Sequence, residues 1–173
     1  ALDLQVHFLP QPMRQIAHRA RKALGERGEG RQARVHHPAM QVASGAPQAA
    51  IARDPDVRLA SRGVVKIQGI ACGLGVEGSG WIARDGVVVT NAHVVAGQDD
   101  TTVQLGGTGP KLSARVVVFD SHDDIAILRV AGLGGRALPI ASEPRSGASG
   151  AILGFPENGP YDVRAGRVGA TRQ

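Results

Sequence analysis

The sequence contains few aromatic residues, a single cysteine and no long apolar segment. Phe, Trp and Tyr make up 3% of the 173 residues, so a folded core must be built from Val, Ile, Leu and Ala. No uninterrupted apolar run approaches the roughly 18 to 20 residues that a membrane-spanning helix needs. The first residues also lack the basic start, apolar stretch and cleavage site of a signal peptide. We expect a soluble chain and, because it begins at Ala1 rather than Met, a piece of a longer protein.

Charge of either sign is not concentrated on the part of the chain that looks folded. Residues 1–60 hold nine Lys and Arg against five Asp and Glu, whereas residues 61–173 hold eleven against ten. Nucleic-acid binding normally requires basic residues on one folded face, with aromatic side chains on which bases stack. Neither feature is present, so the sequence predicts no nucleic-acid partner.

The single cysteine, Cys72, cannot form a disulfide within this chain. A small, buried, apolar side chain is the simplest interpretation. A reactive thiol, or a thiol whose partner lies outside the chain, remains open.

The first sixty residues divide into a basic helix and a linker. Residues 12–24, PMRQIAHRARKAL, place apolar side chains at helical spacing, with Pro12 at the first helical position and Gly25 as a stop. Segment 1–25 is therefore predicted to be a basic amphipathic helical segment, either docked on its own protein or lying on an anionic membrane surface. Segment 26–60 loses this periodicity and is rich in Gly, Ala, Pro and charge, which predicts a flexible linker.

From residue 61 onward, short runs of β-branched residues alternate with turn residues. The runs are GVVKIQGI, GWIA, VVVTNA, TVQL, ARVVVF, IAILRV and GAILGF. Their spacing is typical of a β-sandwich or barrel. Asp85-Gly86 separates two runs and predicts a tight hairpin in which both residues have positive φ. No helical pattern of about 10 to 15 residues intervenes between the runs, so we predict a mainly β fold with antiparallel strands.

Two segments carry candidate chemistry. VVVTNAHVVAG, residues 87–97, places His93 just after an apolar strand, and DSHDDIAILRV, residues 120–130, places Asp124 just before another. A carboxylate beside a buried strand is costly to desolvate unless it has a partner, and an imidazole N–H can be that partner. The carboxylate then fixes the tautomer of the histidine and stabilises the imidazolium that forms during proton transfer. We therefore predict His93 and Asp124 as a catalytic pair.

The order of these motifs resembles that of bacterial trypsin-like serine proteases. EGSGWIARDGVVVTNAHVVAG, then FDSHDDIAILRV, then GAILGFPENGP are similar to segments of the HtrA-like enzymes and of the membrane-anchored actinobacterial acid-resistance proteases of the MarP type. The resemblance covers about residues 61–173. It implies an antiparallel β-barrel of the trypsin-like type, with the first barrel over residues 61–135 and the incomplete beginning of a second barrel over residues 136–173.

The resemblance also implies roles for individual residues. His93 corresponds to the general base and Asp124 to the carboxylate that orients it, in an endopeptidase that acts on proteins or peptides without a cofactor. Ser79 precedes the histidine and lacks the flanks of a nucleophile, so we interpret it as structural. It belongs to GSG, residues 78–80, where small residues permit close packing.

The family's nucleophile has no counterpart in this sequence. It belongs to a Gly-Asp/Asn-Ser-Gly-Gly motif whose loop also forms the oxyanion hole. Residues 125–173 contain no such motif, and SGASG, residues 146–150, lies too near the start of the second barrel. We favour a nucleophile beyond Gln173, in which case this chain alone is inert. The alternative is an inactive relative that serves as a non-catalytic binding module.

The resemblance bears on location as well. Relatives of the MarP type carry membrane helices ahead of a protease domain that faces the outside of the plasma membrane. We therefore expect an extracytoplasmic location and a membrane anchor in helices that precede Ala1. A disulfide in those relatives ties the start of the first barrel to the C-terminal region, which implies a partner for Cys72 outside this chain.

A metal site is the remaining alternative. His93, His122 and Asp124 are residue types that bind zinc, and His122 and Asp124 would share a face if they lay on one strand. No fourth ligand is evident, so we predict no metal.

Overall fold

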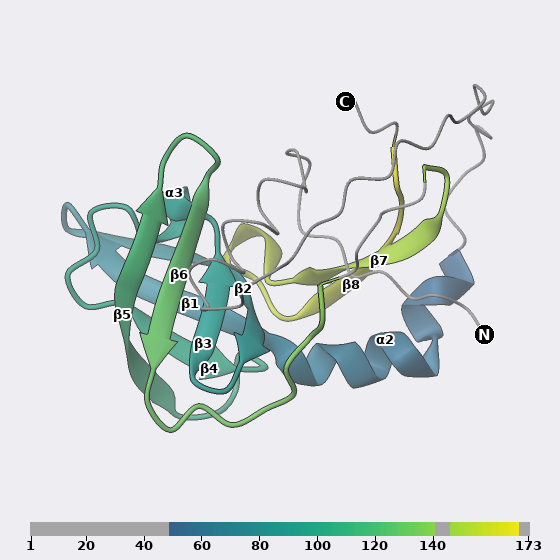
Figure 1. Cartoon of the computed structure of the whole chain (residues 1–173), viewed down its shortest axis with the longest axis horizontal. Helices are drawn as coiled ribbons and strands as arrows, with labels where there is room; N and C mark the ends of the chain where they lie inside the picture. The colour runs from purple at the N-terminus through teal and green to yellow at the C-terminus, as the bar shows by residue number, and fades with distance from the viewer. Residues whose placement is uncertain (1–48, 141–145, 170–173) are drawn as a thin grey trace, which may run out of the picture.

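The computed structural model describes residues 49–140 and 146–169, which form a closed barrel of six antiparallel strands and a separate two-stranded hairpin (Figure 1). The order of strands around the barrel is β1-β2-β3-β6-β5-β4. The barrel strands are β1 (Val64–Ala71), β2 (Leu74–Arg84), β3 (Val87–Thr90), β4 (Thr102–Leu105), β5 (Lys111–Asp120) and β6 (Ile125–Val130), and the hairpin is β7 (Ser149–Gly154) with β8 (Asp162–Arg167). The predicted mainly β, antiparallel barrel is confirmed.

Two of the strands are apolar on both faces, which is why they read as continuous runs in the sequence. Val88 of β3 and Leu128 of β6 point into the core of the barrel. Val87, Val89 and their neighbours on β6 form a second cluster on the outer face, with Trp81 packed against it. By contrast, β5 alternates exposed and partly buried residues along its whole length, as expected for a strand with one face in water.

The glycines of β2 permit the close packing that the sequence predicts. A Cβ atom at Gly78 would lie 2.6 Å from both methyl groups of Val94, and one at Gly80 would lie 2.9 Å from the carbonyl oxygen of Val89. A side chain at Gly78 would therefore push β2 away from α3 (Ala92–Val95), and one at Gly80 would push it away from β3. The small residues allow the strand to pass directly beneath the short helix that follows β3.

Both hairpin turns of the first three strands are tight. The predicted turn at Asp85-Gly86 is present, but positive φ is found at Gly86 (63°) and not at Asp85. A register shift between Ile82 and Arg84 accompanies this turn, which a β-bulge accommodates without two left-handed residues. The turn between β1 and β2 does have two positive φ values, 52° at Cys72 and 77° at Gly73. Cys72 is exposed there, so its interpretation as a buried residue is wrong.

The linker predicted over residues 26–60 is wrong for its last part. Residues 49–60 form a 3-10 helix, η1 (Ala49–Arg53), and the helix α2 (Pro55–Ala60), followed by a second 3-10 turn, η2 (Ser61–Gly63). Asp54 caps α2 by accepting a hydrogen bond from the N–H of Asp56 at 2.8 Å, and Pro55 occupies the first turn. The predicted helix at residues 12–24 and the rest of the linker lie outside the described residues.

Burial of apolar side chains holds α2 in place. Val57 and Ala60 are buried in a cluster with Leu138 and residues of β7, including Leu153. Figure 1 accordingly shows α2 beside the β7–β8 hairpin rather than on the barrel. A short amphipathic helix with two buried residues gives a weak signal inside a segment rich in Gly, Ala and Pro, so the sequence pattern does not reveal it. None of the helices in residues 49–140 and 146–169 is long and apolar enough to span a membrane.

Candidate active site

Strand pairing brings His93 and Asp124 to the same end of the barrel. His93 lies in α3 (Ala92–Val95), a single helical turn that directly follows β3. Asp124 immediately precedes β6, and β3 pairs with β6 so that Thr90 lies opposite Ala126. The two functional segments, 31 positions apart in sequence, are therefore neighbours in space. Ala92, Val94 and Val95 of α3 are buried, whereas the His93 side chain between them is exposed.

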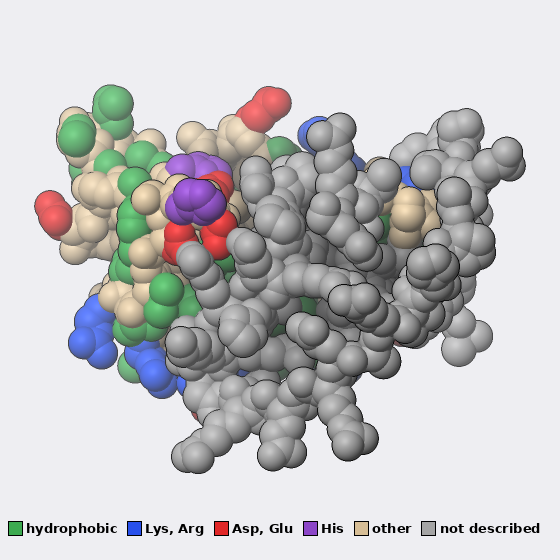
Figure 2. All heavy atoms as spheres, turned by 45° about the horizontal axis from the view of Figure 1, so that its top comes forward, with side chains coloured by type: hydrophobic (Ala, Val, Ile, Leu, Met, Phe, Trp, Pro, Cys, Tyr) green, Lys and Arg blue, Asp and Glu red, His purple; other side chains and the backbone are tan. Residues whose placement is uncertain are grey.

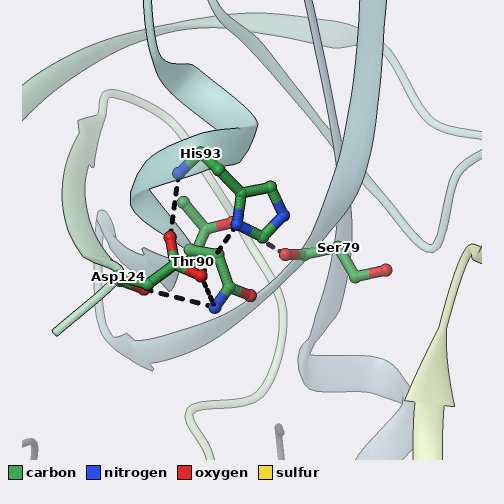
Figure 3. A network of polar contacts seen from close by, with 5 residues as sticks. Ser79, Thr90, His93 and Asp124 are labelled. Carbon is green, nitrogen blue, oxygen red and sulfur yellow. Dashed lines mark hydrogen bonds and ion pairs between the residues drawn. The ribbon is translucent and has the colours of Figure 1, made fainter. Parts of the chain in front are cut away.

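The two side chains are in direct contact (Figure 3). Nδ1 of His93 lies 2.7 Å from Oδ2 of Asp124. The backbone N–H of His93 donates to Oδ1 of the same carboxylate at 3.0 Å. Both oxygens of Asp124 thus bind the histidine residue, one through the ring and one through the main chain. This arrangement fixes the ring with Nδ1 toward the carboxylate and leaves Nε2 on the opposite edge.

Asn91 also binds Asp124, a contact not expected from the sequence. Its Nδ2 donates to Oδ2 of Asp124 at 3.0 Å and to the backbone carbonyl oxygen of Asp124 at 3.2 Å. Asn91 stands at the N-cap position of α3, yet its side chain makes no capping hydrogen bond. A signal for this contact was available, because an asparagine that ends a strand of buried valines needs a polar partner.

These hydrogen bonds determine the charge state of the carboxylate. Partial burial is the largest single influence and raises the pKa of Asp124. The backbone N–H of His93, the His93 ring and the amide of Asn91 act in the opposite direction, and together they hold the pKa below its ordinary value. Asp124 is therefore ionised at neutral pH.

The buried carboxylate of this turn is Asp123 and not Asp124. The Asp123 side chain is 5% exposed and contacts Nδ1 of the exposed His122 at 2.9 Å, whereas the Asp124 side chain is 37% exposed. Our expectation that Asp124, beside a buried strand, is itself buried is thus wrong. Residues 121–124 form a turn rather than a strand, so His122 pairs with Asp123. Within residues 49–140 and 146–169 no three His, Cys, Asp or Glu side chains are arranged to hold a metal.

Both oxygen atoms of Ser79 accept hydrogen bonds from other parts of the fold. Its carbonyl oxygen accepts a hydrogen bond from Oγ1 of Thr90 at 2.8 Å, and its Oγ accepts one from the N–H of Phe155 at 2.8 Å. Figure 3 shows the Ser79 hydroxyl directed away from the His93 ring. These contacts agree with a structural role for Ser79.

The site is open on one face of the barrel. The His93 side chain is 66% exposed, and Figure 2 shows histidine side chains at the surface beside acidic ones. A His–Asp pair of this kind can accept a proton at Nε2 while the carboxylate stabilises the positive charge. Among the described residues, the His93 ring has a hydrogen bond with Asp124, and the Ser79 hydroxyl bonds the N–H of Phe155 instead.

Comparison with known proteins agrees with this geometry. The trypsin-like peptidase domain family matches residues 78–173, more than half of the chain. Serine protease Rv3671c of Mycobacterium tuberculosis is 37% identical over 134 residues, which cover 76% of this chain and 33% of that protein. A probable periplasmic serine endoprotease, DegP-like, of Hahella chejuensis is 38% identical over 99 residues, covering 54% of this chain and 20% of that protein.

The fold comparison gives the same result. The crystal structure of the active form of the Rv3671c protease superposes with a TM-score of 0.67 at 35% sequence identity, over 80% of this chain and 61% of that one. The chain spans about a third of the length of the curated relative. The resemblance to bacterial trypsin-like serine proteases is thereby confirmed, and this chain belongs to the trypsin-like peptidase domain family.

Proposed function

We propose that the chain carries the general base and the orienting carboxylate of a serine endopeptidase, with the nucleophilic serine and the oxyanion hole encoded beyond residue 173. The contact of 2.7 Å between Nδ1 of His93 and Oδ2 of Asp124 carries this proposal. The names of the relatives, serine protease and serine endoprotease, support it. The lack of a Gly-Asp/Asn-Ser-Gly-Gly motif in residues 125–173 supports the position of the nucleophile.

The proposed mechanism assigns one proton path to His93. Nε2 accepts the proton of the serine hydroxyl as its oxygen attacks the peptide carbonyl carbon, and the same nitrogen then gives that proton to the departing amine. Asp124 holds the ring with Nδ1–H toward itself and stabilises the imidazolium in between. Its lowered pKa keeps the carboxylate charged at neutral pH, as this role requires.

Hydrolysis of a protein substrate by the full-length enzyme tests the two roles. Asp124→Asn keeps the size of the side chain but disfavours the required tautomer, and we expect kcat to fall by about 10⁴-fold. His93→Ala should lose at least as much. The matched control is His122→Ala, which removes the other histidine that pairs with an aspartate in the same region, and we expect a change of less than about twofold. Equal loss in all three variants would contradict the assignment.

The position of the nucleophile has its own test. A fluorophosphonate probe should label the full-length protein on a serine beyond Gln173 and should leave the 173-residue chain unlabelled. A label on a serine of this chain would overturn the proposal. A full-length protein that is never labelled, and whose biological activity survives His93→Ala, would instead be a non-catalytic binding module.

We further propose that the protein acts outside the plasma membrane. The support is that the DegP-like relative is named as a periplasmic enzyme. A fusion of alkaline phosphatase to the C-terminus of this chain within the full-length protein should be active, since that enzyme requires an oxidising compartment. Carbonate extraction of the membrane fraction tests the anchor that the family resemblance implies.

A further inference from the structure

We infer that Asn91 is a positioning residue, whose amide holds the Asp124 carboxylate and main chain in the geometry that His93 requires. This inference rests on the proposed function for its catalytic meaning, but the contact itself can be tested in the present chain. The role assigned to Asn91 is exerted through Asp124, the residue that its amide contacts.

The Asn91 side chain occupies a capping position without acting as a cap. Asparagine is a preferred N-cap residue because its side-chain oxygen normally accepts a hydrogen bond from the start of the helix. At α3 this bond is not made. The amide turns instead toward Asp124 and bonds two of its atoms, Oδ2 and the carbonyl oxygen. Both atoms are acceptors, so the amide must present its NH₂ group to them.

The backbone of Asp124 adopts a conformation that needs support. Its φ is 53°, in the left-handed region that residues other than glycine rarely occupy. A bond from Asn91 to the carbonyl oxygen of Asp124 fixes the main chain there, and the bond to Oδ2 fixes the side chain. One amide therefore restrains both parts of the residue.

The carboxylate oxygen Oδ2 of Asp124 is shared between two partners. The same oxygen that contacts Nδ1 of His93 at 2.7 Å accepts from Asn91 at 3.0 Å. Without the amide, Oδ2 would keep only the histidine ring, and the carboxylate, at 37% exposure, could turn toward water. The contacts that hold Oδ2 of Asp124 in place, from Asn91 and His93, therefore both come from residues of the barrel.

Two substitutions separate positioning from capping. Asn91→Asp keeps the size of the side chain and the preference for an N-cap, but it replaces the NH₂ donor by an acceptor. Asn91→Ser is also a good cap and is uncharged, but its hydroxyl is too short to bridge both atoms of Asp124. A residue that served only as a cap would tolerate both changes.

The readout is the NMR spectrum of the histidine rings in the 173-residue chain. In the wild type we expect a downfield Nδ1 proton on His93 that is bound to Asp124. Both variants should lose this signal, and the pKa of Asp124, followed by carboxyl ¹³C shifts, should rise toward its ordinary value. The ring of His122, which pairs with Asp123, is the internal control and should not change. Unchanged His93 signals in both variants would overturn the inference.

Two further outcomes are informative. Loss of the backbone amide pattern of the barrel in both variants would also overturn the inference, because it would make Asn91 a residue of general stability. In the full-length enzyme, both variants should lower kcat on the order of 100-fold with little change in KM. Should the wild-type enzyme hydrolyse no peptide at all, the proposed function fails while the NMR result still decides the role of Asn91.

Discussion

At the scale of single residues, the turn before β6 depends on a carboxylate that takes no part in the proposed chemistry. Oδ1 of Asp120 accepts hydrogen bonds from the backbone N–H groups of His122 and Asp123, both at 3.1 Å. These bonds close the turn one residue before Asp124 enters its left-handed conformation. A side-chain acceptor of this kind is a common way to shape a tight turn.

Replacing this acceptor should weaken the turn. We expect Asp120→Ala to lower the free energy of unfolding by about 1 to 2 kcal/mol, since two backbone donors lose their partner. Asp120→Asn keeps the Oδ1 acceptor and should cost less than half as much. Urea unfolding of the 173-residue chain measures both values. Equal losses in the two variants would show that the charge of Asp120, rather than its two hydrogen bonds, shapes the turn.

Acid should destabilise the chain through carboxylates whose pKa is lowered, Glu77 and Asp124 among them. The pKa of Glu77 is lowered, first by Lys66, whose Nζ lies 2.6 Å from Oε2 of Glu77, and against the opposing effect of burial. The pKa of Asp124 is lowered as described. A carboxyl whose pKa is lower in the folded state stabilises the fold fully above its unfolded pKa, near 4, and loses that contribution as the pH falls through the folded value. The free energy of unfolding should therefore decrease below about pH 4.

Substitution isolates each carboxylate. Glu77→Gln and Asp124→Asn should each flatten the pH dependence of stability between about pH 5 and 2. The control is Glu157→Gln, since Glu157 forms no part of either cluster. Chemical denaturation across this pH range gives the curves. If Glu77→Gln left the slope unchanged, the pair with Lys66 would not persist in solution.

At the scale of elements, a strand could be predicted where its own residues form a strong local pattern, such as a run of apolar residues or a turn dipeptide. The buried runs of β3 and β6 and the Asp85-Gly86 turn are enough to locate three neighbouring strands from the sequence alone. The strand β8 escapes such a prediction because DVRAGR alternates charge with small residues, and its conformation depends on its partner β7. Pairing of this kind is a tertiary effect that local propensity does not report.

The site shows the same division. Chain order and strand context predict that His93, just after one apolar strand, pairs with Asp124, just before another, and the structure has the two side chains in contact. The sequence indicates that Asn91 needs a polar partner, but it does not show that this partner is Asp124. It also does not show that Asp120 closes the turn before Asp124. Hydrogen bonds between a turn and a strand end depend on the register of β3 and β6. Likewise, the sequence does not reveal that Asp123, and not Asp124, is the buried carboxylate.

The contact between β2 and β7 gives a prediction at this scale. A Cβ atom at Gly154 would lie 2.6 Å from Oγ of Ser79, the oxygen that accepts from the N–H of Phe155. Gly154→Ala should therefore destabilise the chain by about 1 to 3 kcal/mol. Thermal unfolding measures the effect. The control is Gly75→Ala, where an added Cβ has nothing within 4 Å.

A double-mutant cycle shows whether Ser79 is the cause. In the Ser79→Ala background the clashing oxygen is gone, so Gly154→Ala should cost clearly less than it does alone. Additive costs would mean that the strain at Gly154 has another origin. Ser79→Ala by itself should cost about 1 kcal/mol or more, because the N–H of Phe155 loses its acceptor.

At the scale of the whole molecule, the barrel and the β7–β8 hairpin are each packed around a different cluster of buried side chains. The barrel encloses one cluster of buried side chains, whereas α2 and the β7–β8 hairpin share another that includes Val57, Leu153 and Phe155 and takes in Val64 at the start of β1. Phe155 links the two parts. It is 5% exposed, its N–H donates to Ser79 of the barrel, and its ring lies over Gly107 on the barrel side and edge-to-face with Tyr161, 5.7 Å between centroids, on the other.

Removing this ring should release the hairpin while the barrel stays folded. Phe155→Ala deletes a buried aromatic side chain and should cost about 3 to 5 kcal/mol of the stability of its cluster. Because the barrel closes on its own strands, amide hydrogen exchange should accelerate in β7, β8 and α2 and remain slow in β3 and β6. The control is Ile152→Ala on the same strand, where the side chain is 49% exposed and little should change. Uniform acceleration in barrel and hairpin would show that the two cores unfold as one unit. In that case His93 and Asp124 would depend on the second core as much as on the barrel strands that carry them.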